Sequence, residues 1–224
     1  MENYIRVNHN SYDALCGEYD DRAKARAIKK SKFEESPESL GGPVLRYAKR
    51  YFSKITVLEI GPGSGEMLAF FEKNNCRTIA VDMSPKMVKV AKIRSPNTDF
   101  VMGNIADIEF GRNQFEIIYA GAVIHLFPLK EALDLLLKIH QWLKPKGFIF
   151  VNTTVHAVPE EGYEIKKDST IQITRFRKKW MESELLAALQ NSGFEILERI
   201  FTDEQDRGKQ WVAYIGQKDI NHEL

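Results

Sequence analysis

An apolar run that ends in three alternating glycines constrains the fold of this chain more than any other stretch. Residues 56–71 read TVLEIGPGSGEMLAFF, so a strand-like run leads into Gly61, Gly63 and Gly65, and a helix-like pattern follows. Glycine allows positive φ and lets a ligand approach the backbone closely. A helix that begins directly after such a turn directs its free amides and the positive end of its dipole at the ligand. The stretch therefore indicates a site for an anionic group, either a pyrophosphate or a carboxylate.

The segments around this turn alternate between strands and helices. Strands are expected at 55–60, 77–82, 98–103, 114–121 and in the second part of 143–154, and helices at 65–74, after Ser84, at 129–143 and at 181–191. Ser84 is expected to cap its helix, with Pro85 in the first position. Gly193 ends the last helix, and FEILERI and QWVAYIGQK then form two strands with no helix between them, which favours an antiparallel pair.

This order of elements predicts an α/β fold. We expect a doubly wound, Rossmann-like, mostly parallel seven-stranded sheet with an antiparallel last strand and helices on both faces. Ligands of such sheets bind beyond the carboxyl ends of the strands, at the point where the strand order reverses. The glycine turn follows the first strand of the pattern, so it is expected to lie at this edge.

The composition narrows the setting of the chain. Its 224 residues suffice for one α/β domain, and 32 basic against 31 acidic residues give a net charge of +1, which argues against a nucleic-acid partner. The N-terminus lacks the apolar core of a signal peptide, and no apolar run reaches the roughly 20 residues that span a bilayer. Cys16 and Cys76 are expected to be free thiols. We expect a cytoplasmic protein with no membrane partner and no metal site.

Two classes of cofactor are compatible with a glycine turn of this kind. A dinucleotide site needs the spacing G-x-G-x-x-G, but here the third glycine comes one position early and Glu66 stands in the sixth place. The pattern present is E-x-G-x-G-x-G, led by Glu59, and it resembles motif I of the class I S-adenosylmethionine-dependent methyltransferases. An NAD(P)-dependent oxidoreductase remains the alternative, because Asp82 would suit the ribose of either cofactor.

Four later stretches resemble the same family in the same order. They are VDMSPKMV, VMGNIADIEF, FEIIYAGAVIHLF and LKPKGFIFV, and the resemblance covers 55 to about 151. It implies that the chain binds S-adenosyl-L-methionine, with the glycine turn against the aminoacyl part. Glu59 would face the cofactor's ammonium group or organise the turn, and Ala120 and Gly121 would flank the methionine end.

The resemblance also assigns residues to the adenosine half of the cofactor. Asp82 would accept hydrogen bonds from both ribose hydroxyls, since both of its oxygens are acceptors, and Met83 is placed in the same site. Asn104 stands where many members have aspartate and would receive the adenine amino group. The backbone of Ile105 would then hold the adenine ring.

The family resemblance divides the chain into four parts within one domain of residues 1–224. We expect an N-terminal helical lid region at 1–52, a cofactor-binding core at 53–154, a substrate-cap insertion at 155–180, and a C-terminal helix and strand hairpin at 181–218. In the lid region a helix is expected at 12–32, a break at 35–43, and a short helix that begins at Pro43 and runs through Phe52. In the cap, TIQITRF alternates like a strand.

Three side chains are candidates for catalysis. His125 follows the fourth strand and His156 the fifth, and a base is needed for a hydroxyl or carbon acceptor more than for a neutral amine. Tyr12 and Tyr19 share one helix face, as a packing stripe or as part of a lid that brings both to the cofactor and Tyr19 to the acceptor. Arg22 would then pair with the cofactor's carboxylate. The alternatives are a wall-shaping residue for His125 and a solvent-facing loop residue for His156.

The expected function is methyl transfer to a small molecule, at oxygen, then nitrogen, with carbon third. The family leaves two other possibilities: a methyltransferase that acts on protein or RNA, and a member that binds the cofactor but methylates nothing. The basic residues of the cap would either attract an acidic substrate or form a solvated rim. A monomer or homodimer is expected.

Overall fold

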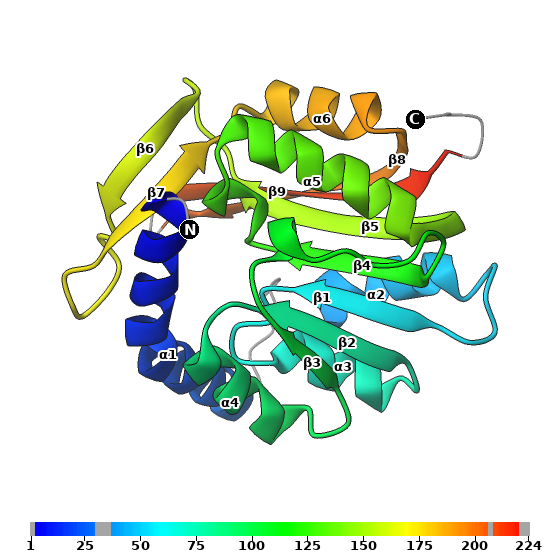
Figure 1. Cartoon of the computed structure of the whole chain (residues 1–224), viewed down its shortest axis with the longest axis horizontal. Helices are drawn as coiled ribbons and strands as arrows, with labels where there is room; N and C mark the ends of the chain where they lie inside the picture. The colour runs from blue at the N-terminus through cyan, green and yellow to red at the C-terminus, as the bar shows by residue number, and fades with distance from the viewer. Residues whose placement is uncertain (1–2, 30–36, 206–207, 220–224) are drawn as a thin grey trace.

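The computed structural model describes residues 3–29, 37–205 and 208–219, and a seven-stranded sheet forms its centre (Figure 1). The strands are β1 (Thr56–Ile60), β2 (Arg77–Asp82), β3 (Asp99–Met102), β4 (Phe115–Gly121), β5 (Leu143–Thr154), β8 (Phe194–Glu204) and β9 (Lys209–Lys218). Their order is β3-β2-β1-β4-β5-β9-β8. The first five are parallel, and β9 runs antiparallel between β5 and β8. The predicted doubly wound sheet with an antiparallel last strand is confirmed.

Helices and short 3₁₀ turns surround the sheet. They are α1 (Asn3–Lys29), α2 (Pro37–Ala48), α3 (Glu66–Lys73), η1 (Ile105–Asp107), η2 (Ile124–Leu126), α4 (Pro85–Arg94), α5 (Leu129–Trp142) and α6 (Glu182–Asn191). Neighbouring strand residues point to opposite faces, so Leu58 packs in the apolar layer of α5 and α6 and Val57 in the layer of α2 and α3. None of the helices in the described ranges is long and apolar enough to cross a membrane.

The helix α4 starts where the sequence predicts. The Ser84 side chain accepts a hydrogen bond from Met87 N at 3.1 Å, and Pro85 occupies the first position, where its missing amide costs nothing. The helix begins three residues after Asp82, the last residue of β2, so the cap fixes the path of the chain between Asp82 and the helix.

A small hairpin and the helix α1 lie over the carboxyl ends of the parallel strands (Figure 1). The hairpin consists of β6 (Glu160–Ile165) and β7 (Thr174–Lys179), paired antiparallel outside the main sheet. Asn8 of α1 accepts the Phe176 amide at 2.8 Å and donates to the Leu126 carbonyl at 3.1 Å. Towards its other end, α1 pairs Asp20 with Arg94 of α4 at 2.6 Å. The helix is therefore attached on both sides of the strand ends that it crosses.

The lid region differs from the prediction in two places. The helix α1 begins at Asn3 rather than at residue 12, and the expected end at residue 32 lies outside the described residues. The helix α2 begins at Pro37 and carries Pro43 in its interior, so the prediction that Pro43 starts this helix is wrong. Packing explains the glycine at position 41 of this helix, because a Cβ there would lie 2.6 Å from the Met67 sulfur of α3.

The fifth strand begins earlier than expected. Leu143 already pairs with Phe115, and the register then shifts before Ile117 pairs with Phe148. Lys146 has a φ of 63° within this segment, so the predicted turn is an irregularity inside β5. The strand β6 was absent from the prediction, whereas TIQITRF does contain the start of β7.

Candidate active site

The three glycines of the turn all have positive φ, and for different reasons. A Cβ on Gly61 (φ 66°) would lie 2.6 Å from a side-chain carbon of Val123, and one on Gly65 (φ 81°) would lie 2.9 Å from the Ala91 backbone. A Cβ on Gly63 (φ 54°) would meet nothing nearer than a Tyr19 ring carbon at 3.7 Å. Packing therefore excludes side chains at the outer two positions, while the middle glycine faces open space.

Two cavities meet above this turn, at the carboxyl edge of the sheet. They enclose about 840 and 900 Å³, open mouths included, within the range of small-molecule sites. Both are lined by Tyr19, Gly61, Gly63, Gly121 and Ala122. The first extends over the ends of β2 and β3, and the second extends towards α2, α3 and β9. A ligand longer than one cavity can therefore lie across the turn and occupy both.

The first cavity holds the residues predicted for the adenosine half of a cofactor. Asp82, Met83, Asn104 and Ile105 all line it. Burial raises the pKa of Asp82 to about 6, although its Oδ1 accepts the Ser84 amide at 2.8 Å. Asn104 Oδ1 accepts the amide of the second residue of η1 at 3.3 Å and so caps this turn.

The second cavity contains a buried carboxylate that is only partly satisfied. Glu59 is 4% exposed, and its Oε2 has no hydrogen-bond partner among the described residues. Burial, with the neighbouring charges of Asp82 and Glu66, raises the pKa of Glu59 well above its usual range. Glu66 lines the same cavity at the start of α3. A buried unpaired oxygen of this kind is costly, and a cationic ligand group would offset that cost.

The end of β4 closes the site with a strained turn. Ala122 has a φ of 56°, which is rare for a residue with a Cβ. Its amide donates to Asn152 Oδ1 at 2.6 Å, so the fifth strand holds this turn in place. Of the two residues predicted to flank the methionine end of the cofactor, Gly121 lines both cavities, whereas Ala120 is buried in the core and is absent from both linings.

The two tyrosines of α1 reach the site. Tyr12 and Tyr19 lie edge to face with ring centroids 6.0 Å apart, and both line the first cavity. Burial holds the pKa of Tyr19 well above its ordinary value, so its hydroxyl keeps its proton at neutral pH. Arg22 points elsewhere, because its guanidinium donates to Glu18 at 3.3 Å and to the Asp168 carbonyl at 2.5 Å.

The two candidate histidines lie outside both cavity linings. His125 is 3% exposed, and its Nδ1 is 2.9 Å from the Thr153 hydroxyl. Burial and the nearby arginines lower the pKa of His125 well below its usual range. His156 is half-buried, with Nε2 3.1 Å from the Thr154 hydroxyl. A catalytic role for either histidine stays a prediction.

Sequence reasoning missed several lining residues. Tyr4 and Asn8 line the first cavity, and Trp211 and Asn152 line the second. Tyr4 and Asn8 continue the helix face of Tyr12 backwards in steps of four residues, so the same periodicity extended towards the N-terminus would have found them. No local pattern marks Asn152 or Trp211, because their place depends on the pairing of β5 with β9.

Comparisons with known proteins indicate the family to which this fold belongs. A family model described as a methyltransferase domain matches residues 58–151. An uncharacterised methyltransferase of Synechocystis is 27% identical over 100 residues, covering 45% of this chain and 47% of that protein. The phosphoethanolamine N-methyltransferase of Plasmodium falciparum is 31% identical over 143 residues, 59% of this chain and 52% of that protein. The chain thus spans about half the length of these two relatives.

A solved structure shows the same fold over nearly the whole chain. It is the 1,6-didemethyltoxoflavin-N1-methyltransferase of Burkholderia thailandensis, with bound 1,6-didemethyltoxoflavin and S-adenosylhomocysteine. The TM-score is 0.64 at 17% identity, and the match covers 94% of this chain and 90% of the other. At this identity the likeness concerns the fold alone.

Proposed function

Because the chain belongs to the class I S-adenosylmethionine-dependent methyltransferases, we propose that it transfers the methyl group of S-adenosyl-L-methionine to a small-molecule acceptor. The acceptor atom is oxygen or nitrogen, with carbon third. One observation carries the proposal: two cavities meet at an open glycine turn, with Asp82 in one and the unpaired carboxylate oxygen of Glu59 in the other.

The first cavity suits an adenosine. The Asp82 carboxylate has one oxygen bonded to the Ser84 amide and keeps acceptor capacity for the ribose hydroxyls. Ile105 and Met83 offer apolar surface for the adenine ring, and Asn104 stands beside them. These four residues lie at or just after the carboxyl ends of β2 and β3, so the sheet fixes their spacing.

The second cavity suits an amino-acid group. Glu59 Oε2 would accept from an ammonium group, and an ammonium close by would bring the raised pKa of Glu59 down again. The α3 helix begins directly after Gly65 without a side-chain cap, so its first amides remain available to a carboxylate. When bound, the cofactor supplies a methyl group on a positively charged sulfur.

The chain's own residues then have to hold the acceptor and exclude water. The helix α1 covers the strand ends and places Tyr12 at the first cavity and Tyr19 at both cavities, and a protonated Tyr19 hydroxyl can donate to the acceptor. Orientation of this kind is worth about 7–11 kcal/mol, more than one general base provides. Within the described residues no histidine lines either cavity, which favours an acceptor that needs little help in losing a proton.

A small acceptor fits this site better than a polymer does. The helix α1 and the β6–β7 hairpin lie over the strand ends and leave cavities of small-molecule size. The names of the Plasmodium and Burkholderia proteins also indicate methylation of nitrogen in small molecules.

Calorimetry tests the proposal directly. Titration with S-adenosylhomocysteine should give saturable binding with one site per chain, and NADH should give none; the reverse would make the protein an NAD(P)-dependent oxidoreductase. Incubation of a cell extract with methyl-labelled cofactor should then label compounds below the size of proteins and RNA. Label found in protein or RNA alone would contradict the small-molecule assignment.

A further inference from the structure

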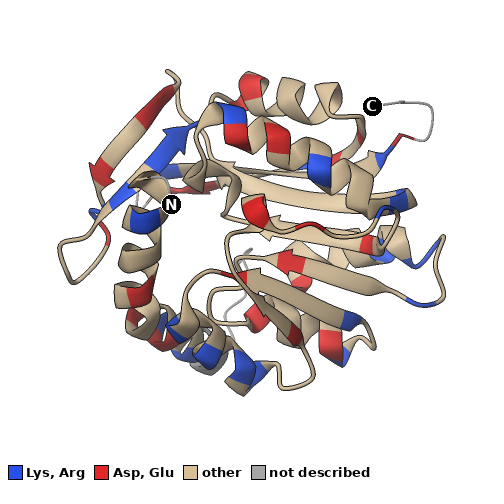
Figure 2. Cartoon of the chain, viewed as in Figure 1, with Lys and Arg blue, Asp and Glu red and all other residues tan. Residues whose placement is uncertain are grey.

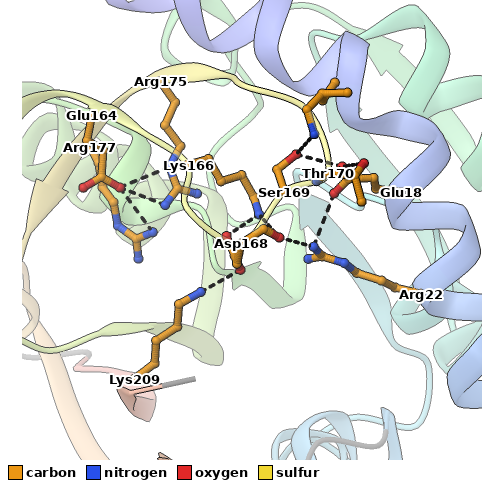
Figure 3. Close-up of polar contacts among 11 residues, drawn as sticks. Glu18, Arg22, Glu164, Lys166, Asp168, Ser169, Thr170, Arg175, Arg177 and Lys209 are labelled. Atoms are coloured by element: carbon orange, nitrogen blue, oxygen red, sulfur yellow. Dashed lines mark hydrogen bonds and ion pairs between the residues drawn. The ribbon is translucent and has the colours of Figure 1, made fainter. Parts of the chain in front are cut away.

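A cluster of charged side chains joins the cap to the lid (Figure 3). Its cations are Arg22, Lys166, Arg175, Arg177 and Lys209, and its acids are Glu18, Glu164 and Asp168. Five cations against three acids leave a net charge of +2. Figure 2 shows the basic residues of β7, whose sequence is TRFRKK, beside the acidic residues of β6. The excess charge lies within the protein, since Lys166, Arg175 and Arg177 are all buried.

The acids of this cluster are already committed to other cations. Glu164 Oε1 accepts two hydrogen bonds from Arg175, at 3.2 and 2.8 Å. Asp168 pairs with Lys166 and, at 2.8 Å, with Lys209. Glu18 pairs with Arg22 at 3.3 Å and also accepts from two hydroxyl groups of the cap. These pairings leave little negative charge for the remaining guanidinium.

That guanidinium belongs to Arg177. The residue is 8% exposed, and its nearest carboxylate in the described part of the chain is Glu164 at 4.0 Å. Its Nη2 donates to the Thr154 hydroxyl at 2.6 Å, while its Nε has no partner among the described residues. A buried cation without a bonded anion costs several kcal/mol in general. Since Arg177 does not stabilise the fold through a hydrogen-bonded ion pair, a role in ligand binding would account for its presence.

The position of Thr154 places Arg177 at the second cavity. Thr154 lies two residues beyond Asn152 on β5, so both side chains point to the same face of the sheet. On β9, Trp211 is paired with Thr154, and Lys209 lies two residues before Trp211 on that same face. Asn152 and Trp211 line the second cavity. Arg177 and Lys209 are not themselves lining residues, but Arg177 bonds Thr154 and Lys209 lies beyond Trp211 on this face, so both lie beyond the Asn152–Trp211 edge of the cavity, farther along the strands than the row that contains Glu59.

We propose that the methyl acceptor carries an anionic group, a carboxylate or a phosphate, which Arg177 and Lys209 bind at the outer end of the second cavity. The inference rests on the proposed function and names the class of its substrate. A guanidinium matches the two oxygens of either group with parallel hydrogen bonds. Lys209 is a quarter exposed and its ammonium can turn from Asp168 to the ligand. The rest of the acceptor then lies against Trp211, towards Tyr19 and the glycine turn.

Calorimetric titration of two dianions tests this site. Inorganic phosphate and malonate are titrated into the protein saturated with S-adenosylhomocysteine and into the protein alone, with neutral malonamide as the blank. We expect saturable binding of at least one dianion, weakened at least tenfold in Arg177→Gln. The tighter of the two dianions identifies the anionic group as phosphate or carboxylate. Lys167→Gln is the matched control, because it removes an exposed cation from the same cap and should leave the affinity within twofold.

Stability measurements separate this role from a structural one. Arg177→Met should keep or raise the thermal midpoint of the ligand-free protein, because the arginine lacks a bonded carboxylate; a structural ion pair would give a lower midpoint. The affinity for S-adenosylhomocysteine should stay within twofold in Arg177→Gln. An equal loss of cofactor and dianion affinity would mean that Arg177 holds the cofactor's carboxylate, and the proposal would be overturned.

The titrations also distinguish a failure of the proposed function from a failure of the inference about the acceptor. A wild-type protein that binds no S-adenosylhomocysteine contradicts the methyltransferase assignment, whereas the titrations of the protein alone still decide whether Arg177 binds dianions. No saturable binding of either dianion by the wild type, or the same affinity in Arg177→Gln, would overturn the inference about the acceptor.

Discussion

The residues predicted for the adenosine half of the cofactor lie close together in the sequence, whereas the lining of the second cavity comes from distant parts of the chain. Within the first, the residues for the adenosine half follow two consecutive strands and lie between Asp82 and Ile105. The second combines the glycine turn with Tyr19, Asn152 and Trp211, which are far apart in sequence. A ligand site built from one continuous stretch is readable from local motifs, whereas a site assembled by tertiary contacts is not.

The glycine turn and the outer end of the second cavity differ in the sign of the charge that the protein leaves unsatisfied. Beside the glycine turn, the buried carboxylate of Glu59 and the partly buried carboxylate of Asp82 have raised pKa values. At the outer end of the second cavity, the Arg177 guanidinium lacks a bonded carboxylate. Each deficit would be relieved by a ligand group of opposite sign or by hydroxyl donors. The unsatisfied charges at the site therefore lower the stability of the ligand-free protein, and bound ligands would offset this loss. Single-residue variants can measure each contribution separately.

The largest expected effect comes from the glycine turn and tests its role in binding. Gly63→Val should abolish detectable binding of S-adenosylhomocysteine in calorimetry, because the new side chain would fill open space between the cavities. Gly65→Ala is the matched comparison, since its Cβ would lie 2.9 Å from the Ala91 backbone. It should lower the unfolding free energy by about 1–3 kcal/mol. Normal cofactor binding by Gly63→Val would contradict the placement of the ligand across the turn.

A smaller but still large effect is expected at Asp82. Asp82→Ala should lower the affinity for S-adenosylhomocysteine by roughly a hundredfold, because hydrogen bonds to a charged group contribute about 1.5–3 kcal/mol each. The measurement is calorimetric affinity, with the exposed neighbour variant Lys86→Gln as a control that should change it little. An Asp82→Ala protein that binds as the wild type does would exclude the ribose contact.

The contrast between the two cavities explains how far the sequence alone could predict this molecule. Asp82 and the glycines follow strands whose ends can be located from apolar runs and helix caps, so their meeting at one edge was predictable. The start of α1 at Asn3 was not, because that first part of the helix depends on contacts such as those of Asn8 with Phe176 and Leu126. Helix propensity near the N-terminus gives no sign of these partners.

The cap shows the same limit. The strand β6 contains Gly162 and three glutamates, a composition that disfavours strands, and it forms through pairing with β7. The burial of Arg177 likewise depends on the packing of β7 over Thr154. The number of basic residues in the sequence is compatible with both a solvated rim and an anion site, and only the tertiary packing of the cap distinguishes them.

The third prediction, of smaller size, concerns the protonation of Asp82. As pH rises, the stability of the ligand-free protein and its affinity for the cofactor should change in opposite directions. The folded pKa of about 6 exceeds the unfolded value of 3.8, so this group's contribution to stability is full below about pH 4 and is lost as pH rises through 6. Asp82→Asn should therefore stabilise the ligand-free protein at pH 7 by about 1–3 kcal/mol and change little at pH 4.

Cofactor binding should follow the opposite trend with pH. The ionised carboxylate accepts from both ribose hydroxyls, so the affinity of the wild type for S-adenosylhomocysteine should rise as pH increases through about 6. In Asp82→Asn this step should be absent. Denaturant titrations and calorimetry at pH 4 to 8 measure both effects, and a variant that is less stable than the wild type at pH 7 would contradict the role of burial.

The smallest expected effect concerns the attachment of the lid to the cofactor side. Arg94→Gln removes the pair with Asp20 at 2.6 Å and the hydrogen bond to the carbonyl of Ser64, within the glycine turn, at 3.1 Å. Partly buried contacts of this kind contribute about 1 kcal/mol, so amide exchange in α1 should quicken and cofactor affinity should fall about fivefold. Lys24→Gln is the control, because Lys24 is 62% exposed and pairs with the same Asp20. If Lys24→Gln and Arg94→Gln change α1 exchange equally, the Arg94 contact does not hold the lid, and the cover over the two cavities must depend on α1's contacts with the cap.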